Sequence, residues 1–408
     1  MTEPLSPLSL SASSAGSAAL PECRQAPENL FGLDRYGLRA CFTAMGETPW
    51  RADQVMQWIY RRGVDDFAAM TNLGKALRER LARRFVVQPP RCIVGQRSVD
   101  GTRKWVLELE ARDGRPAAAI ETVYIPEEGR GTLCISSQAG CAMDCAFCST
   151  GKGGFSRNLT AAEIIAQVWF AAKTLSTVPE GAGVSQPAHG HEPLLRAGEV
   201  ISNVVFMGMG EPLANYANVL TALHILLDDF GFGLSKRRVT VSTSGLVPFI
   251  DRLAADVDTA LAISLHAPDD ALRDELVPIN RKYPIAELMQ ACRRYVAGKD
   301  RKAHIIYEYV MLDGVNDQPE RARQLARLLG DMPAKVNLIP FNPFPQTRFR
   351  RSSAQAIAKF AGILHDKGIM TTTRRTRGDD IDAACGQLVG RIRSRQKHRL
   401  GDNARGAQ

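Results

Sequence analysis

The strongest constraint on the fold of this chain is an alternation of strand-like and helix-like segments that runs from residue 133 to about residue 375. Seven apolar runs read as strands: LCISS, SNVVFMG, RVTVSTS, ALAISLHA, HIIYEYVM, KVNLIP and IMTTTRR. Helical stretches such as TAAEIIAQVWFAAKTL lie between them, and Thr160 and Glu163 form a capping-box pattern at the start of that stretch. Repeated units of this kind predict an α/β fold with a parallel sheet, either open or closed into a barrel.

The regions around this alternation have different compositions. We expect residues 1–26 to be a disordered leader, because the segment is rich in Ser, Ala and Pro and does not resemble a secretory signal. Residues 27–90 have helical periodicity and several arginines, which fit an RNA-facing surface and an ordinary solvated helix face equally well. Residues 91–132 contain three strand-like runs, at 92–98, 103–109 and 118–126, and form a β extension.

The remaining residues, 133–390, are the expected barrel core. Two segments depart from its rhythm. Residues 176–199 are rich in Gly, Pro and His and are expected to be a loop insert. Residues 391–408 are expected to be a basic tail that contacts either RNA or solvent.

The composition narrows the class of protein. Apolar residues make up 45% of the 408 residues, and no apolar run approaches the length of a membrane span. Lys and Arg total 52 against 43 Asp and Glu, and the resulting charge of +9 permits an anionic partner such as nucleic acid. The nine cysteines are an odd number and three are clustered, which favours metal binding or catalysis in a reducing cytoplasm over a disulfide framework.

The clustered cysteines are Cys141, Cys145 and Cys148, in the run CAMDCAFCST. Their spacing would align three thiols on a helix, but Gly140 before them and the glycine-rich stretch after them favour a loop. Soft thiolates select zinc or iron–sulfur centres, and both ordinarily take four protein ligands. Three ligands are therefore either an incomplete set or a set that leaves one metal position open.

The spacing CxxxCxxC, with the aromatic Phe147 before the last cysteine, resembles the signature of the radical S-adenosylmethionine (SAM) superfamily. Four further motifs resemble the RlmN-type dual-specificity RNA methyltransferases, whose relative is the Cfr resistance methyltransferase: GMGEP at 208–212, SLHAP at 264–268, NLIPFNP at 337–343 and DIDAACGQL at 380–388. The resemblance covers residues 28 to 390, approximately. It implies a radical-SAM partial (β/α)6-type barrel with a small N-terminal helical domain and a short β extension.

The positions of these motifs along the alternation are consistent with one site. Each candidate residue follows or closes a predicted strand, and the carboxyl ends of the strands form the active-site face of βα barrels. The resemblance implies that Cys141, Cys145 and Cys148 bind a [4Fe–4S] cluster whose open iron binds SAM. It also implies a set of SAM contacts: Gly210, Glu211, Ser242, Ser264, Leu265, His266 and Asn342.

The resemblance further implies three catalytic residues. Cys385 would carry a methyl group that is activated and added to the adenine carbon, and Cys134 would help to remove the C2 proton and close a transient disulfide with Cys385. Glu121 would be the proton acceptor. Each residue also has an ordinary structural reading: Cys134 as a small core residue, Cys385 as a helix cap, and Glu121 as a polar residue at a strand edge.

The implied activity is methylation of adenosine C2 in 23S rRNA, near the peptidyl-transferase centre, and in tRNA, 3′ of the anticodon. Two SAM molecules would be used per turnover, with an electron donor such as a flavodoxin. We expect a cytoplasmic monomer without a membrane partner. Two alternatives remain open from the residues: methylation at adenosine C8, as in Cfr, and a non-catalytic iron–sulfur redox sensor that binds RNA.

Overall fold

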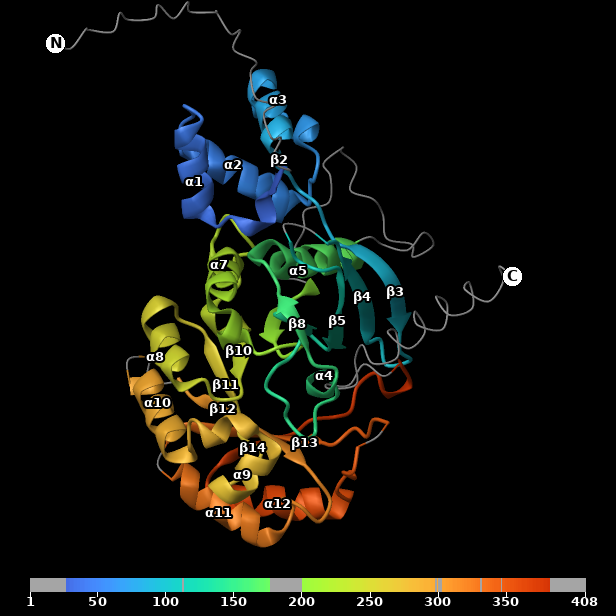
Figure 1. The fold of residues 1–408 in the computed structure, drawn as a ribbon, viewed down its shortest axis with the longest axis vertical. Coiled ribbons are helices and arrows are strands. Elements are labelled where there is room, and N and C mark those ends of the chain that lie inside the picture. Colours follow the sequence, from blue (N-terminus) through green and yellow to red (C-terminus); the bar gives the residue numbers. More distant parts are fainter. Residues whose placement is uncertain are drawn as a thin grey trace, which may run out of the picture.

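Ten strands form one continuous sheet in the computed structural model of the chain, which describes residues 27–111, 114–176, 200–297, 299, 303–330, 332–345 and 347–381 (Figure 1). Their spatial order is β14 (Met370–Thr373), β13 (Ala334–Pro340), β12 (Ile305–Met311), β11 (Ala260–Ser264), β10 (Val239–Thr243), β9 (Asn203–Phe206), β6 (Arg130–Cys134), β5 (Ala118–Glu127), β4 (Arg103–Leu109) and β3 (Arg91–Arg97). Neighbours from β14 to β6 are parallel, and those from β6 to β3 are antiparallel.

The sheet is open, because β14 and β3 lie at its two edges instead of pairing with each other. The connecting helices are α5 (Ala161–Ser176), α7 (Tyr216–Leu227), α8 (Val247–Asp256), α9 (Asp270–Leu276), α10 (Ile285–Ala297), α11 (Pro319–Leu329) and α12 (Ala354–Asp366). Figure 1 shows α7, α8, α10, α11 and α12 along the outer side of the curved sheet. The α/β partial barrel expected from the sequence is therefore confirmed.

Most predicted elements are found close to where they were expected. At the start of α5, Glu163 N donates to Thr160 Oγ1 at 3.1 Å and Thr160 N donates to Glu163 Oε2 at 2.9 Å, which is the predicted capping box. The strand expected at 133–137 lies three residues earlier, at 130–134. The buried residues that follow it, such as Ile135, continue to bond the end of β9, so their burial resembles that of a strand.

The three strands of the β extension belong to the same sheet as the barrel. β5 pairs with β6 in antiparallel register, with Val123 opposite Cys134. β3 is the edge strand, and most of its side chains are exposed. The turn between β3 and β4 spans Ser98 to Thr102 and extends toward the C-terminal end of the described chain.

Residues 28–86 form a helical layer above α5 and α7 (Figure 1). The elements are β1 (Glu28–Asn29), α1 (Arg35–Ala44), α2 (Trp50–Met56), a π-helical turn (Gln57–Arg61), α3 (Lys75–Arg84) and β2 (Phe85–Val86), together with short 3-10 turns at 30–32 and 67–69. The layer shares the main hydrophobic core with the barrel. Trp169 of α5 is buried against it, and its Nε1 donates to the carbonyl of Ile59 at 2.9 Å.

A histidine–aspartate pair also joins the helical layer to the barrel. His224 Nδ1 on α7 lies 3.0 Å from Oδ2 of Asp34, whose other oxygen accepts from Gly37 N at the start of α1. The hydrogen bond between the pair raises the pKa of His224 and lowers the pKa of Asp34. The pair is part of the contact between the two layers, and it is ionic when His224 is protonated.

Two connections lie at opposite ends of the barrel strands. The chain leaves α5 at Ser176 and is described again from Val200, near the amino end of β9. The cysteine-containing loop instead follows the carboxyl end of β6. Residues 1–26, 177–199 and 382–408 fall outside the described residues, so the predictions for the leader, nearly all of the insert and the tail concern parts that the structure does not describe.

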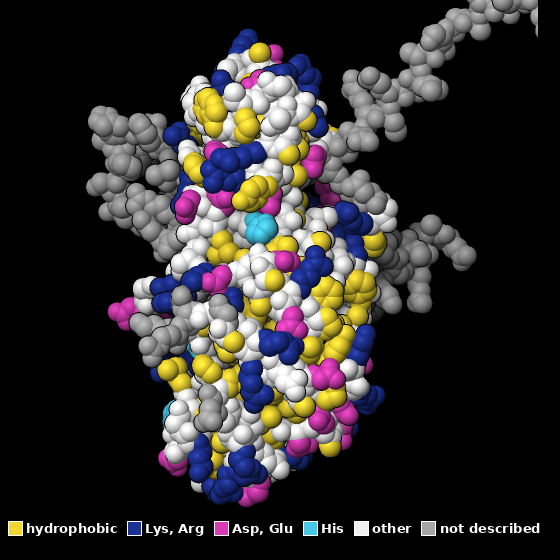
Figure 2. All heavy atoms as spheres, turned by 90° about the vertical axis from the view of Figure 1, so that its left-hand side faces the viewer, with side chains coloured by type: hydrophobic (Ala, Val, Ile, Leu, Met, Phe, Trp, Pro, Cys, Tyr) yellow, Lys and Arg dark blue, Asp and Glu magenta, His cyan; other side chains and the backbone are white. Residues whose placement is uncertain are grey.

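On the face shown in Figure 2, Lys and Arg side chains alternate with acidic and hydrophobic ones and do not form one uninterrupted basic surface. None of the helices in the described part of the chain combines the length and apolar character that a bilayer-spanning segment needs.

Candidate active site

The three clustered cysteines lie on a loop between β7 (Gln138–Gly140) and the short helix α4 (Ser149–Lys152). Gly140 has φ +79°, and a Cβ atom there would lie 1.9 Å from the carbonyl oxygen of Gly154. Cys141 N donates to that same oxygen at 3.1 Å, so the loop closes on the strand β8 (Phe155–Asn158) only because residue 140 has no side chain. The predicted loop, rather than a helix face, is what the structure contains.

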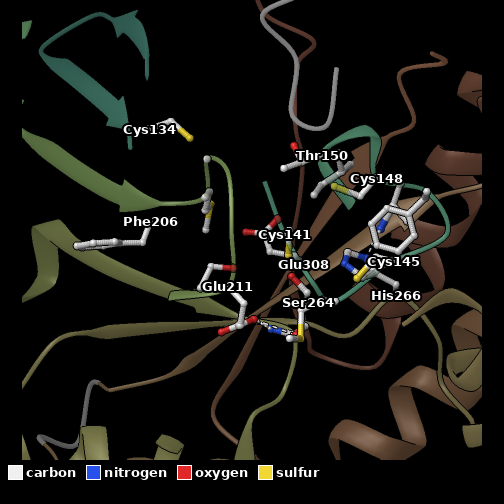
Figure 3. A pocket seen from close by; sticks show the side chains of 18 of the residues that line it. Cys134, Cys141, Cys145, Cys148, Thr150, Phe206, Glu211, Ser264, His266 and Glu308 are labelled. Atoms are coloured by element: carbon white, nitrogen blue, oxygen red, sulfur yellow. Dashed lines mark hydrogen bonds between the residues drawn. The ribbon is translucent and has the colours of Figure 1, made fainter. Parts of the chain in front are cut away.

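The thiols of Cys141, Cys145 and Cys148 line one pocket at the carboxyl ends of the parallel strands (Figure 3). Burial raises the pKa of Cys141 to about 12 and also raises the pKa of Cys145. Buried thiols of this kind ionise only when a cation compensates the charge, and a coordinating metal deprotonates a thiol outright.

Three thiols on one pocket wall fit an iron–sulfur cluster better than a single ion. In the described residues, no three metal-binding side chains gather closely enough to hold one metal ion. In a cluster each cysteine binds a different iron atom, so the thiols do not need to meet at one point. The donor set is therefore suited to a cluster with three protein ligands.

Glu211 supplies a buried carboxylate in the same pocket. Its Oε2 accepts hydrogen bonds from Ser244 N at 2.7 Å and Ser244 Oγ at 2.8 Å, and its Oε1 accepts from Leu213 N at 3.1 Å. Burial raises the pKa of this carboxyl, and the bonds from Ser244 only partly oppose the shift. A positively charged ligand group in the pocket would favour the ionised form, as expected for an ammonium.

The glycines of the GMGEP motif are required by contacts within the protein. Gly210 has φ +103°, and a Cβ there would lie 2.5 Å from Cβ of Gln138. Gln138 also accepts a hydrogen bond from Glu211 N at 2.8 Å and donates to Asn158 at 2.7 Å. The turn is thus packed against the strand that precedes the cysteine loop, which ties the two parts of the site together.

Of the other predicted cofactor contacts, four line the pocket and Leu265 does not. Ser242, Ser264, His266 and Asn342 line the pocket. Leu265 does not; its side chain is fully buried in the main core, and only its backbone faces neighbouring strands. Leu265 N donates to Glu308 O at 3.1 Å, so any contribution from this residue comes from the backbone or from packing.

His266 is held in one orientation and is neutral. Its backbone has φ +60°, its Nδ1 accepts from Val310 N at 3.0 Å, and its ring packs edge-on against Phe147 at 4.4 Å. Burial lowers its pKa to about 3. The proton of the neutral ring is consequently on Nε2, because Nδ1 acts as an acceptor.

Of the three predicted catalytic residues, one lines the pocket. Cys134 ends β6 and is buried in a small cluster with Val123 and Val205. Glu121 is not among the lining residues, but it lies two residues before Val123 on β5 and so faces the same side of the sheet. It is 3% exposed on an interior strand, which rules out the strand-edge interpretation. Cys385 lies outside the described residues.

Several polar residues at or next to the pocket were not identified from the sequence, among them Glu308 and Arg273. Glu308 lines the pocket from the middle of β12, accepts from Asn337 Nδ2 at 2.8 Å, and has its pKa raised by burial. A charged residue inside the apolar run HIIYEYVM was the available signal.

Arg273 on α9 is completely buried and bonds two residues that line the pocket, Ser244 and Ser264. It donates to the carbonyl oxygens of Ser244 at 2.6 Å, Leu265 at 3.1 Å and Ser264 at 3.2 Å, and to Asn280 Oδ1 at 2.8 Å. It therefore holds the carboxyl ends of β10 and β11 together. In the sequence it is indistinguishable from an ordinary surface arginine on a helix.

Comparison with known proteins agrees with these observations. A family model described as the ribosomal RNA large subunit methyltransferase N-terminal domain matches residues 28–87, and a radical SAM superfamily model matches residues 191–326, which lie beyond the cysteine loop. Two Pseudomonas putida strains have proteins named dual-specificity RNA methyltransferase RlmN, which are 53% and 52% identical over 90% of this chain and 92% of their own length. A crystal structure of a radical SAM methyltransferase from Sphaerobacter thermophilus has a TM-score of 0.77 and 44% identity, over 88% of this chain and 99% of that one.

Proposed function

The chain belongs to the RlmN family of radical SAM RNA methyltransferases, and from this membership we propose that it methylates C2 of adenosine in 23S rRNA and in tRNA. Methylation of RNA with SAM is the activity of the family, whereas the choice of carbon and the residue roles are our proposal. The main supporting observation is that the three-cysteine loop, the carboxylate of Glu211 and the thiol of Cys134 share one pocket at the carboxyl ends of the strands.

The residues present fit the two groups that the family uses. Cys141, Cys145 and Cys148 would hold a [4Fe–4S] cluster, because they supply three soft donors on one wall of a half-buried pocket. Glu211 would receive the amino group of SAM, and Ser242, Ser264, His266 and Asn342 would contact the rest of that molecule. When bound, the cluster supplies the electron that splits the sulfonium of SAM to give a 5′-deoxyadenosyl radical.

The residues of this chain would then deliver carbon to an unreactive position. Adenine C2 is an sp² carbon with little nucleophilicity, so a polar transfer from a sulfonium to it is unfavourable. In the proposal Cys385 carries the methyl group whose carbon becomes the new substituent, and Glu121 accepts the proton that leaves adenine C2. Cys134 then bonds to the sulfur of Cys385 as the bond from that sulfur to the transferred carbon breaks, which releases the product and leaves a transient disulfide. The shared face of Glu121, Val123 and the Cys134 cluster is consistent with this division of roles.

The RNA and the other partners are part of the same proposal. The helical layer of residues 28–86 would hold folded RNA through phosphates and shape, with exposed arginines such as Arg62 and Arg83 on its surface. A protein such as a flavodoxin would supply electrons, and the chain would act as a cytoplasmic monomer.

Anaerobic reconstitution with iron and sulfide, followed by dithionite reduction with SAM and unmodified RNA, tests the proposal. We expect 5′-deoxyadenosine together with 2-methyladenosine, identified by mass spectrometry against 2-methyl and 8-methyl standards. The 8-methyl product would show Cfr-like chemistry, and a cluster that is saturated by the protein and cleaves no SAM would show a redox sensor.

Variants of two cysteines test the role of Cys385. C385A should assemble the cluster but form no methylated RNA. C92S is the matched control, because Cys92 is exposed on β3 and has no place in the proposed chemistry. Normal methylation by C385A would disprove the methyl-carrying role.

A further inference from the structure

The turn between β3 and β4 is bonded to a segment of the chain that is almost three hundred residues away in sequence. Asp100 Oδ2 accepts from Gly378 N at 3.1 Å and lies 3.9 Å from Arg377 Nη1. In return, Asp380 accepts from Ser98 Oγ at 2.5 Å and from Val99 N at 3.3 Å. We refer to the set Ser98, Asp100, Gly378 and Asp380 as the C-terminal clamp.

The turn is preorganised for these contacts. Gly101 has φ +84° and closes a tight loop, in which Ser98 N donates to Thr102 O at 2.8 Å. The carboxylate of Asp100 is fixed from within the turn by Thr102 N at 2.9 Å. Burial opposes its ionisation, but hydrogen bonds from Thr102, Gly378 and Ser98 outweigh this effect and lower the pKa of Asp100 to about 2. The carboxylate of Asp100 is therefore ionised at neutral pH.

The clamped segment leads from one part of the pocket to another. At its start, Arg374 lines the pocket and its backbone N donates to Leu338 O at 2.8 Å. At its end, Ile381 packs against the cluster of Val123, Cys134 and Val205. The clamp holds the segment between these two points, and Ile381 brings the chain into contact with the Cys134 cluster.

We propose that the C-terminal clamp positions Cys385 at the pocket, with Ser98 and Asp100 as positioning residues for the methyl-carrying thiol. This inference rests on the role proposed above for Cys385. It also gives the β extension a function in the reaction: β3 and β4 support the turn that captures the returning end of the chain.

The size of the effect follows from the reach of a polypeptide. Cys385 is four residues beyond Ile381, so its α carbon is within about 14 Å of Ile381 in any conformation. If the segment were released as far as Arg374, eleven residues would separate Cys385 from the last fixed point, and the reach would grow to about 40 Å. If the tether is a flexible chain, the effective concentration of the thiol at the pocket falls with about the 3/2 power of its length, which is about fivefold. If the thiol instead samples the whole sphere within reach, the concentration falls with the cube of the length, which is about twentyfold.

The experiment uses the reconstituted full-length protein with a double variant, S98A/D100A, and with D380A. Three products are measured: 5′-deoxyadenosine, the S-methyl group on the Cys385 peptide, and methylated adenosine. We expect 5′-deoxyadenosine to stay within twofold of the unmodified protein, because none of the changed residues lines the pocket. Methylated adenosine per 5′-deoxyadenosine should fall about 5- to 20-fold, with a parallel fall in the rate of S-methylation.

Controls separate positioning from folding. E128Q changes an exposed acidic residue in the turn between β5 and β6 and should leave the ratio of products unchanged. Adding S98A to D380A should cause little further loss, because the two side chains share one hydrogen bond.

Three results would overturn the inference. They are an unchanged product ratio in S98A/D100A, an equal loss of all three products, and full additivity of S98A and D380A. The C385A variant is measured alongside: RNA methylation by C385A would defeat the proposed function itself, whereas an inactive C385A combined with a normal product ratio in S98A/D100A would defeat the clamp alone.

Discussion

Arg273 offers the most direct test of how the pocket is held together. Its guanidinium is buried, and three of its nitrogens reach four acceptors on β10, β11 and the turn that contains Asn280. Burial lowers its pKa only to about 10, so the group stays charged at neutral pH. Replacement by lysine keeps the charge but leaves a single nitrogen to serve these acceptors.

The expected loss can be worked out from the acceptors. Nη1 of the arginine bonds Asn280 Oδ1, whereas Nη2 bonds the carbonyl oxygens of Ser244 and Ser264, and one ammonium group cannot occupy both places. Leu265 O keeps the hydrogen bond from Ala267 N at 2.8 Å, so R273K leaves at least one acceptor without a donor. A buried polar group without a partner costs roughly 1–3 kcal/mol, so R273K should lower the free energy of unfolding by at least about 1–3 kcal/mol. The affinity for SAM should also fall, because Ser264 and Ser244 lie at the affected strand ends.

Anaerobic urea unfolding, followed by tryptophan fluorescence, measures this loss as a lower midpoint. R252K is the matched control, since Arg252 makes an exposed ion pair with Asp256 at 3.3 Å and should change stability by no more than about 0.5 kcal/mol. If R273K and R252K unfold at the same urea concentration, the interpretation of Arg273 as the group that joins β10 to β11 is wrong.

Three further predictions concern the turn at Gly210, the carboxylate of Glu211 and the contact between His224 and the helical layer. G210A should bind SAM more weakly than G314A in titrations and should lose more stability in thermal unfolding. Both positions have positive φ, but only at Gly210 would a Cβ atom meet another residue. Equal losses in the two variants would refute the proposed clash. E211Q should weaken SAM binding by roughly 1.5–3 kcal/mol in equilibrium titration. E320Q changes an exposed carboxylate and should leave the affinity unchanged. An unchanged affinity in E211Q would show that Glu211 does not contact the ammonium group of SAM. H224Q should lower the thermal midpoint most between about pH 4 and 6.5. Because the pKa of His224 is raised in the folded protein, its contribution to stability is fully present below pH 6.5 and is lost as the pH rises through the folded pKa. Because the pKa of Asp34 is lowered, its contribution is present above pH 3.8 and is lost as the pH falls through the folded pKa. A difference between wild type and H224Q that is largest above pH 8 would contradict this sign.

The sequence predicts the parts of this fold that depend on local pattern. The strand runs, the capping box of Thr160 and Glu163, and the loop around Cys141 all follow from neighbouring residues, and each is present. The boundary of β6 was displaced because Ile135 is buried beyond the end of the strand and continues the same apolar pattern.

What the sequence could not supply are contacts between distant residues. Arg273 bonds to the ends of two strands, and Asp100 meets Gly378 across most of the chain; neither pairing leaves a local signal. Gly210 was expected to be a SAM contact and does line the pocket, but the residue that leaves no room for a side chain there is Gln138 of the protein itself. The motif therefore predicted the location of the turn and not the physical reason for its composition.

Val200 lies just before the amino end of β9, whereas the cysteine loop, Glu211 and His266 all follow carboxyl ends of strands. A fluorescent label attached at Val200 would thus lie near the amino end of β9, at the end of the strands away from the chemistry, where it could report on RNA capture without obstructing the pocket.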